Sequence, residues 1–524
     1  MTPTENTAPS FDLRRQAWIP VIRLNGSRAE LGLQKALSLA HEWRAISDPL
    51  PTVEFGLYRL LVAFVLDIFT PQNGEDWADL WAGTKLDEGR IAAYFDQHEG
   101  VFDLFGDRPF GQSAGMEGEQ SKPLAGLLHS MPSGTATNHF HHYGEEDFGV
   151  SPACAARFLA TIAPFMTAGG AGLSPSINGS PPLYVLPLGE NGFHTVLLNT
   201  PVYADLLLSQ GEVSVSWRQT EAVCATRATE ASLLQGLTWR PRKIQLVPAS
   251  GGVCSLSGQR CQTLVRAMKF APGWGAGFEW TDPNAAYRLG DERTILRLRE
   301  GREVWRDTGP LALLRGGSSE KTHVRPAILS QIAELGKENY FQATQTLQMA
   351  IYGLRTDMKM KVFEWQRETL SVPLALLWED LEASEAQSAM NEADKVAYAI
   401  KRAVKITYPR EAQGNDKAFE TLANSATTLF WRDLRAHYDD HLRFLAAKPD
   451  EETRLAGRQK WRQTLRDQGW RALKFAIDGL DGDAKALKRQ TDAYASFSRA
   501  LFALLEPEKA RASKERRKTK ELTA

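Results

Sequence analysis

From about residue 374 onward, apolar residues recur at the 3.6-residue period of an amphipathic helix. Four apolar stripes follow one another, and each needs a partner that buries it. This pattern predicts a bundle of four helices joined by short connections. The stripes are Val396, Ile400, Ala403 and Val404; Phe419, Leu422, Ala426, Leu429, Phe430 and Leu434; Trp461, Leu465, Ala472, Leu473 and Ile477; and Leu487, Tyr494, Phe497, Leu501 and Leu504.

Polar segments separate the four stripes, at residues 409–416, 447–452 and 478–483. Their Gly, Pro, Asn and Asp residues are typical of helix stops and caps. A strongly basic run, KARASKERRKTKE (509–521), follows the last stripe and indicates a solvated tail. The C-terminal part therefore divides into a four-helix bundle over 371–508 and a basic tail over 509–524.

The preceding 370 residues have a different texture. The runs PLYVLPL (182–188) and HTVLLN (194–199) have the composition of strands, and short helical stretches lie between such runs. Clusters of Gly, Pro and Ser interrupt the pattern repeatedly, and no regular alternation of strands and helices is visible. We therefore predict an α+β protein, in which an irregular mixed α/β N-terminal domain (1–370) precedes the C-terminal four-helix bundle.

Composition places the chain among globular proteins of two or three domains, with 524 residues and 43% hydrophobic content. The formal net charge of −1 means that any binding to a polyanion must come from local patches. The N-terminus lacks the apolar core of a secretory signal, and the run LLVAFVLDIF (60–69) is too short to span a membrane. Since the four cysteines are too scattered for a disulfide framework, we expect a cytoplasmic protein and a buried helix at 60–69.

The segment TNHFHHYGEED (137–147) is the first candidate for chemistry, because it holds His139, His141 and His142. A metal-dependent hydrolase built on these histidines is one reading. The spacing is unfavourable for it, since residues this close in sequence do not converge easily on one ion, and there is no HExxH or CxxC motif. An exposed contact loop, or an ordinary surface loop, fits the same residues. No cofactor and no metal is expected.

Three further segments carry candidate binding residues. TAGGAGLSPSINGSPP (167–182) offers backbone amides that can approach a ligand closely, although a tight turn or linker would have the same composition. Lys269 stands alone among apolar neighbours, so it either extends along a strand edge or presents one cation to a phosphate or base edge. The loop RGGSSEKTHVRPAIL (315–329) ends in a proline that starts a helix. Nucleophile motifs such as GxSxG or SxxK are absent from the sequence.

Taken together and in order, these segments resemble the large subunit of type I-E CRISPR Cascade surveillance complexes, the Cse1/CasA family. The resemblance covers nearly the whole chain. It is carried by FDLRRQAWIPVIRLNG (11–26), LYRLLVAFVLDIF, RPFGQ (108–112), SGTATNHF (133–140), the glycine loop before NGSP, VLLNTP (196–201), GLTWRPRKI (236–244), the KF pair at 269–270, Gly316–Gly317 and the helical C-terminal part.

The resemblance implies a non-enzymatic protein. Such a subunit recognises a short motif beside the target in double-stranded DNA, helps to open the duplex and recruits a helicase-nuclease, while the guide RNA reads the sequence. The implied partners are guide RNA, double-stranded target DNA, the other Cascade subunits and the helicase-nuclease, with no membrane. A subunit that serves only as a structural scaffold is the remaining alternative.

The resemblance also assigns roles to individual residues. Motif recognition falls on the glycine loop and on one lysine, and the duplex wedge falls in the loop after Gly316–Gly317, where this chain has Arg325–Pro326 and not the expected glutamine. A contact loop toward guide RNA and DNA falls on the histidine-rich segment. The residues so assigned are Gly169, Gly170, Gly172, Lys269 and Arg325 for DNA, and Asn138, Phe140 and His141 for the contact loop.

Four arginines recur at every fourth position of the third predicted helix, Arg454, Arg458, Arg462 and Arg466, so they share one flank of it. Such a flank could follow a DNA backbone, contact a neighbouring subunit, or be solvated.

Overall fold

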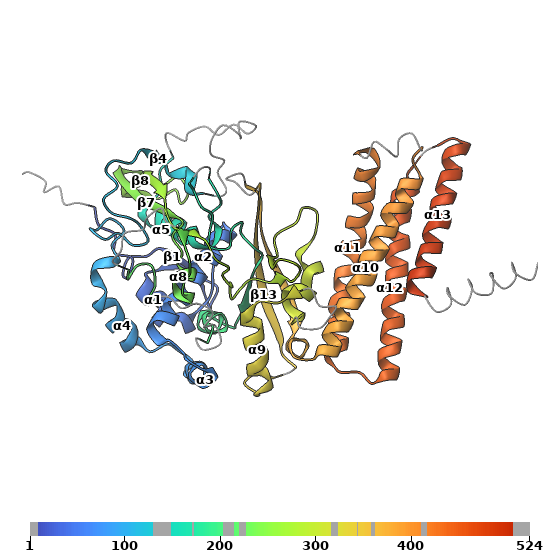
Figure 1. Cartoon of the computed structure of the whole chain (residues 1–524), viewed down its shortest axis with the longest axis horizontal. Helices are drawn as coiled ribbons and strands as arrows, with labels where there is room; N and C mark the ends of the chain where they lie inside the picture. The colour runs from blue at the N-terminus through green and yellow to red at the C-terminus, as the bar shows by residue number, and fades with distance from the viewer. Residues whose placement is uncertain are drawn as a thin grey trace, which may run out of the picture. The chain divides into compact units, whose positions relative to one another are not determined.

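The computed structural model describes residues 9–128, 148–169, 172–202, 214–219, 227–315, 323–342, 344–357, 362–409, 417–480 and 482–506. The chain divides into two compact units. The first comprises Met1–Phe341 and Leu347–Leu370, and the second comprises Gln342–Thr346 and Ser371–Ala524. Figure 1 colours the elements of both units along the chain.

Helix α2 (Pro51–Phe69) forms a large part of the core of the first unit, and nearly every residue in it is buried. Its sequence is apolar on all sides, which is the pattern of a helix enclosed by protein. Its charged residues are paired: Glu54 with Arg367 at 3.0 Å, Arg59 with Asp282 at 2.8 Å, and Asp67 with Arg218 at 2.7 Å. The expectation of a buried helix at 60–69 is confirmed. Among the described helices, none has a stretch long and apolar enough to cross a membrane.

The other helices of the first unit are shorter and lie between irregular segments. Their bounds are α1 (Leu33–Ser38), α3 (Gly74–Ala82), α4 (Glu88–Gln97), α5 (Pro152–Ala160), α6 (Ile162–Phe165), α7 (Gly192–Leu198), α8 (Leu233–Leu237) and α9 (Ala327–Lys337).

The strands form several small sheets rather than one large one. The sheet orders are β2-β1-β3, β4-β8-β7, β14-β13-β5, β11-β10-β12 and β6-β9. The strands are β1 (Ile19–Arg23), β2 (Arg28–Leu31), β3 (Trp43–Ile46), β4 (Ser121–Pro123), β5 (Tyr184–Leu188), β6 (Arg227–Ala228), β7 (Arg242–Val253), β8 (Arg260–Pro272), β9 (Gly275–Ala276), β10 (Tyr287–Arg288), β11 (Thr294–Ile295), β12 (His323–Val324), β13 (Thr346–Thr356) and β14 (Val362–Pro373).

One of the two predicted strands is confirmed and the other is wrong. Residues 184–188 form β5, whereas the run HTVLLN belongs to α7. The side chain of Asn191 caps α7 by accepting a hydrogen bond from the backbone amide of His194 at 2.9 Å. A short apolar run is compatible with a buried strand or a buried helix, and periodicity alone does not separate them.

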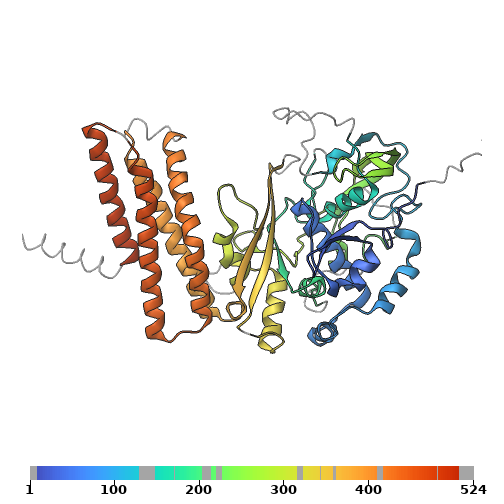
Figure 2. The same cartoon turned by 180° about the vertical axis from the view of Figure 1, so that it is seen from behind.

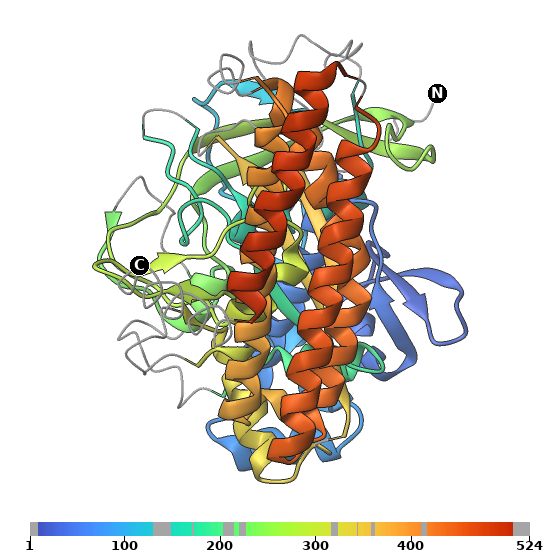
Figure 3. The same ribbon diagram turned by 90° about the vertical axis from the view of Figure 1, so that its right-hand side faces the viewer.

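The second unit contains four long helices among its described residues, α10 (Asp380–Ile406), α11 (Lys417–Ala446), α12 (Glu451–Ile477) and α13 (Ala484–Leu505). Figure 3 shows them running alongside one another. Asp450 and Asp483 cap α12 and α13 by accepting hydrogen bonds from backbone amides two to three residues into each helix. The mixed N-terminal part and the C-terminal bundle confirm the predicted α+β fold class.

The predicted apolar stripes coincide closely with the core of the bundle. Val396, Ile400, Leu434, Leu465 and Leu473 are all fully buried. Leu487 departs from the prediction because its side chain is 56% exposed. It lies in the first turn of α13, whereas the buried residues of this helix begin at Ala493.

The buried imidazole of His441 makes the stability of the bundle depend on pH. Its ring stacks on Trp461 at 5.2 Å between ring centroids, and burial lowers its pKa to about 4, although the nearby Glu385 opposes the shift. In the unfolded chain the same group titrates near its ordinary value of about 6.5. Between these values the unfolded state binds more protons, so the free energy of unfolding falls as the pH falls from about 6.5 to 4, by roughly 2–3 kcal/mol.

We predict that His441→Gln reduces this acid destabilisation, measured by thermal unfolding at pH 7 and pH 5. His437→Gln is the matched control, since His437 is exposed one turn earlier on α11. An equal pH response in the wild-type chain and in both variants would contradict the role of His441.

Candidate nucleic-acid interface

The β7–β8 hairpin carries Lys269 on a polar face. The register pairs Lys269 with Gln245 of β7 on one side and with Ser121 of β4 on the other. Since directly paired residues of antiparallel strands share a face, Lys269, Gln245 and Lys243 lie on the same side of the hairpin, which is drawn in green in Figure 2. Met268 and Phe270 point to the opposite side, where they are buried.

Lys269 is half-buried, as a lysine that extends along a strand would be. Among the residues that the structure describes, its ammonium has no hydrogen-bond or ion-pair partner. The carbonyl oxygen of the neighbouring Gln245 side chain is buried and likewise accepts no hydrogen bond within the described part of the chain. A donor and an acceptor are thus adjacent and unused on this face.

The glycine loop lies next to the end of the same hairpin. The amide of Gly169 donates to the carbonyl of Leu173 at 3.2 Å, which closes the loop on itself. Gly172 has a φ of +77°, in the left-handed region that favours glycine. A Cβ at Gly172 would lie 3.8 Å from the ring of Pro272, the last residue of β8. Gly170 is outside the described residues.

Arg242 joins the glycine loop to the hairpin. Its guanidinium donates to the carbonyl of Thr167 at 2.8 Å and to the carbonyl of Ser174, so it holds both ends of the loop. Its side chain is 2% exposed and lies over the ring of Phe270, at 5.5 Å from the centroid. Burial lowers the pKa of Arg242 to about 10, which leaves it charged at neutral pH.

The structure therefore places the glycine loop at the end of the strand that carries Lys269, and the register puts Pro272 and Arg242 on the opposite face of the hairpin from Lys269. Lys269 precedes Pro272 by three residues, which corresponds to about 10 Å along a strand, and Gly172 is beside Pro272. The sequence analysis did not identify Arg242, although it is part of the segment GLTWRPRKI. Two arginines around a proline, directly before an alternating strand, were the available signal.

Arg325 lies elsewhere in the first unit and is 1% exposed. Its guanidinium donates to the hydroxyl of Ser330 at 3.2 Å and to the carbonyl of Ala312 at 3.3 Å. These contacts hold the start of α9 against the preceding segment. In this placement the guanidinium is enclosed by protein, and the role predicted for Arg325 in the duplex wedge stays a prediction.

The residues predicted for the contact loop, Asn138, Phe140 and His141, lie outside the described residues, as do His139 and His142 of the alternative metal site. Within the described part of the chain, no group of three or more His, Cys, Asp or Glu side chains is placed to hold a metal ion.

The four arginines of α12 contact acids of the second unit. Arg454 pairs with Glu382 at 2.9 Å, Arg462 with Glu392 at 2.7 Å, and Arg466 with Glu506 at 2.6 Å. Arg458 pairs with Glu385. The flank is therefore a row of ion pairs, mainly between α12 and α10. A guanidinium that already has a carboxylate partner loses that partner if it binds a phosphate, so these contacts favour a structural role for the flank.

The comparisons with known proteins agree with the fold and with the resemblance seen in the sequence. Residues 12–472 match the family described as CRISPR-associated protein Cse1 (CRISPR_cse1), so the chain belongs to this family. A relative from Thermus thermophilus, described as CRISPR-associated protein CasA/Cse1, is 27% identical over 94% of this chain and 98% of its own length.

Two solved structures share the fold. The Cse1 protein of Acidimicrobium ferrooxidans is similar with a TM-score of 0.75 and 22% identity, over 95% of this chain and 99% of that one. A chain in a structure described as a CRISPR RNA-guided surveillance complex is similar with a TM-score of 0.74 and 16% identity, over 93% of this chain and 99% of that one.

Proposed function

We propose that this chain is the large subunit of an RNA-guided CRISPR surveillance complex and that it recognises the motif beside the target in double-stranded DNA. Membership of the Cse1 family and the similarity to a chain of a CRISPR RNA-guided surveillance complex support the first part. The implied partners are guide RNA, the other subunits of the complex, target DNA and a helicase-nuclease that the subunit recruits after the duplex opens.

The observation that carries the second part is the arrangement around Arg242. The glycine loop is held at both ends by a buried guanidinium, and that guanidinium lies against the residue after Lys269. A narrow groove of DNA admits backbone without side chains, so a loop fixed in one conformation can approach base-pair edges there. Lys269, three residues before the end of the strand that the loop contacts and on its other face, can donate to the acceptors of A·T pairs, N3 and O2, which gives a tolerant readout.

Lys269 and the glycine loop have complementary roles in this proposal. Phosphate contacts position a protein on DNA without reading its sequence, whereas contacts to base edges discriminate between sequences. Gly169, Gly170 and Gly172 bring the backbone close to the base edges, and Lys269 supplies the donor. Arg242 is a positioning residue, because it fixes the loop from inside the protein.

The proposal is tested by a gel-shift experiment on the reconstituted complex with duplexes that differ only in the motif. The complex with this subunit should prefer the motif-bearing duplex, and the complex without it should lose that preference. Each measurement is made at two salt concentrations, because binding by phosphate contacts alone weakens with salt and shows no motif preference. If the complex without this subunit still prefers the motif-bearing duplex to the full extent, the subunit serves only as a scaffold.

A further inference from the structure

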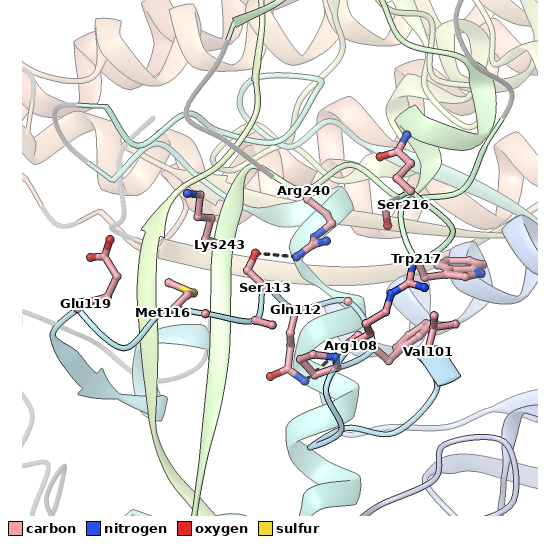
Figure 4. Close-up of a pocket in the computed structure, with 17 residues that line it drawn as sticks. Val101, Arg108, Gln112, Ser113, Met116, Glu119, Ser216, Trp217, Arg240 and Lys243 are labelled. Carbon is pink, nitrogen blue, oxygen red and sulfur yellow. Dashed lines mark hydrogen bonds between the residues drawn. The ribbon is translucent and has the colours of Figure 1, made fainter. Parts of the chain in front are cut away.

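A cavity of about 530 Å³ opens in the first unit beside the approach to β7. It lies between the segment 108–119, the segment 216–219 and the start of β7, and Figure 4 shows the side chains around it. Its volume is within the roughly 300–1,000 Å³ of typical small-molecule sites, so one nucleotide fits where a duplex does not.

The charged groups of the cavity are mostly cationic. Arg108, Arg240 and Lys243 line it, and Glu119, which is exposed, is the acid among the described residues that do so. Within the described part of the chain, none of the three cations has a carboxylate partner. This distinguishes them from the arginines of α12, each of which has one.

Arg240 is the most constrained of the three cations. One guanidinium nitrogen donates to the hydroxyl of Ser113 at 2.9 Å, while Nε is buried and has no acceptor among the described residues. Burial lowers the pKa of Arg240 to about 10, so the side chain remains charged at neutral pH. Arg240 is half-buried, and a partly desolvated cation without a counter-charge is costly, so an anion that enters the cavity relieves that cost.

One wall of the cavity is aromatic and rigid. Phe110 and Trp217 line it, and their rings lie 5.3 Å apart. Trp217 stacks on Phe64 at 4.4 Å and donates from its indole nitrogen to the hydroxyl of Tyr94 at 3.0 Å. Phe110 and Trp217 are each 6% exposed, so a base that enters the cavity meets a small part of each ring, with its phosphate at the cations.

We infer that this cavity binds a single nucleotide unit of a nucleic acid strand, with its phosphate at Arg240 and Lys243 and its base against Phe110 and Trp217. The inference goes beyond motif recognition, because these groups are outside the glycine loop. The choice of a nucleic acid over another phosphate-bearing ligand rests on the proposed function. The strand is either the guide RNA or a strand of the opened target.

The first test measures binding of the full chain to fluorescein-labelled 12-nucleotide single strands of RNA and DNA, by fluorescence anisotropy at two salt concentrations. Arg240→Gln and the double variant Arg108→Gln/Lys243→Gln should each weaken binding about 5-fold or more. Each lost phosphate contact should also reduce the salt dependence by about 0.7 in log–log slope.

Arg260→Gln is the matched control, because Arg260 is an exposed cation at the far end of the hairpin. The double variant keeps the test valid if Arg240→Gln fails to fold, because Arg108 is exposed and Lys243 is half-buried, so their replacement should disturb the fold less. If both cavity variants keep their thermal unfolding transition and bind the strands with wild-type affinity and salt dependence, the inference is wrong.

The second test identifies the strand. A photo-crosslinking amino acid replaces Ala114, which is exposed at the cavity, and the complex is reconstituted with labelled guide RNA and then with labelled duplex. A crosslink to guide RNA before target is added assigns the RNA, and a crosslink to DNA after target is added assigns the DNA. A crosslink to neither overturns the inference.

Motif preference in the same complexes separates this inference from the proposed function. The cavity variants should retain the wild-type ratio of affinities for motif-bearing and motif-lacking duplexes. A ratio reduced toward one would show that the cavity takes part in motif recognition, contrary to the inference. If the wild-type complex has no motif preference but the cavity variants still weaken strand binding, the proposed function fails and the cavity assignment stands.

Discussion

Replacing Arg242 by methionine is expected to lower the affinity of the reconstituted complex for motif-bearing duplex by at least about 10-fold, which corresponds to about 1.4 kcal/mol. The affinity for motif-lacking duplex should change little. Arg242 donates to the carbonyls of Thr167 and Ser174, so its loss removes both hydrogen bonds at the ends of the loop that we propose contacts the DNA.

The same substitution should also destabilise the first unit. Each carbonyl that loses a charged donor while it remains buried costs about 1–3 kcal/mol. For the two carbonyls together we therefore expect a loss of roughly 2–6 kcal/mol in the free energy of unfolding. Denaturant unfolding of the isolated chain measures this loss, and gel shifts of the complex measure the affinities.

Two further variants make the role of Arg242 testable apart from folding. Arg242→Lys keeps the charge but cannot bridge two carbonyls with one planar group, so an intermediate loss of motif affinity is expected. Arg260→Met removes an exposed arginine from the same hairpin and should leave the motif preference unchanged. A folded Arg242→Met complex with full motif preference would show that Arg242 does not position the loop.

Replacing Lys269 by alanine is expected to reduce capture of motif-bearing duplex about 5- to 100-fold while the complex still assembles. The range follows from the roughly 1–3 kcal/mol that a well-placed contact to a base edge contributes. Because Lys269 has no protein partner among the described residues, its removal breaks no intramolecular ion pair. Gel shifts measure the affinity, and size-exclusion chromatography measures assembly.

Lys122→Ala is the matched control for Lys269→Ala. Lys122 is exposed, and it directly follows Ser121, the residue of β4 that pairs with Lys269. Its ammonium lies over the ring of Phe270, at 4.8 Å from the centroid, on the face opposite to Lys269. If the Lys269→Ala complex binds the motif-bearing duplex as tightly as the Lys122→Ala complex does, the assignment of Lys269 is wrong.

The two substitutions should not be additive. If Arg242 acts only by holding the loop that works beside Lys269, the combined variant loses less motif affinity than the two single losses together. An additive double variant would indicate that Arg242 and Lys269 act at independent sites.

The four-helix bundle shows how much structure can be predicted from the local pattern of apolar residues. A helix with a continuous apolar stripe needs no knowledge of distant residues, because the period of 3.6 depends only on neighbours in the sequence. The stripes of α10 to α13 were therefore predictable, together with the caps Asp450 and Asp483. The same information could not reveal that three arginines of α12 pair with acids 70–73 residues away and that Arg466 pairs with an acid 40 residues away.

The candidate interface depended more strongly on distant contacts. Lys269 and the glycine loop were predicted one by one as candidate binding residues, through their residue types and through the resemblance to the Cse1/CasA family, and their role stays a prediction. Arg242 was not recognised, because its function arises from carbonyls 68 and 75 residues earlier in the chain. The burial of Arg325 was equally invisible, since the sequence shows only a polar loop before a proline-initiated helix.

The amino-acid sequence thus established the division into a mixed α/β part and a helical bundle, the family resemblance, and several candidate residues. These properties depend on periodicity, composition and the order of short motifs, all of which are local. Which donors meet which acceptors depended on the packing of segments far apart in the chain. The bonds from Arg242 to Thr167 and Ser174, the enclosed Arg325 and the cationic cavity around Arg240 therefore became visible only once those segments were brought together.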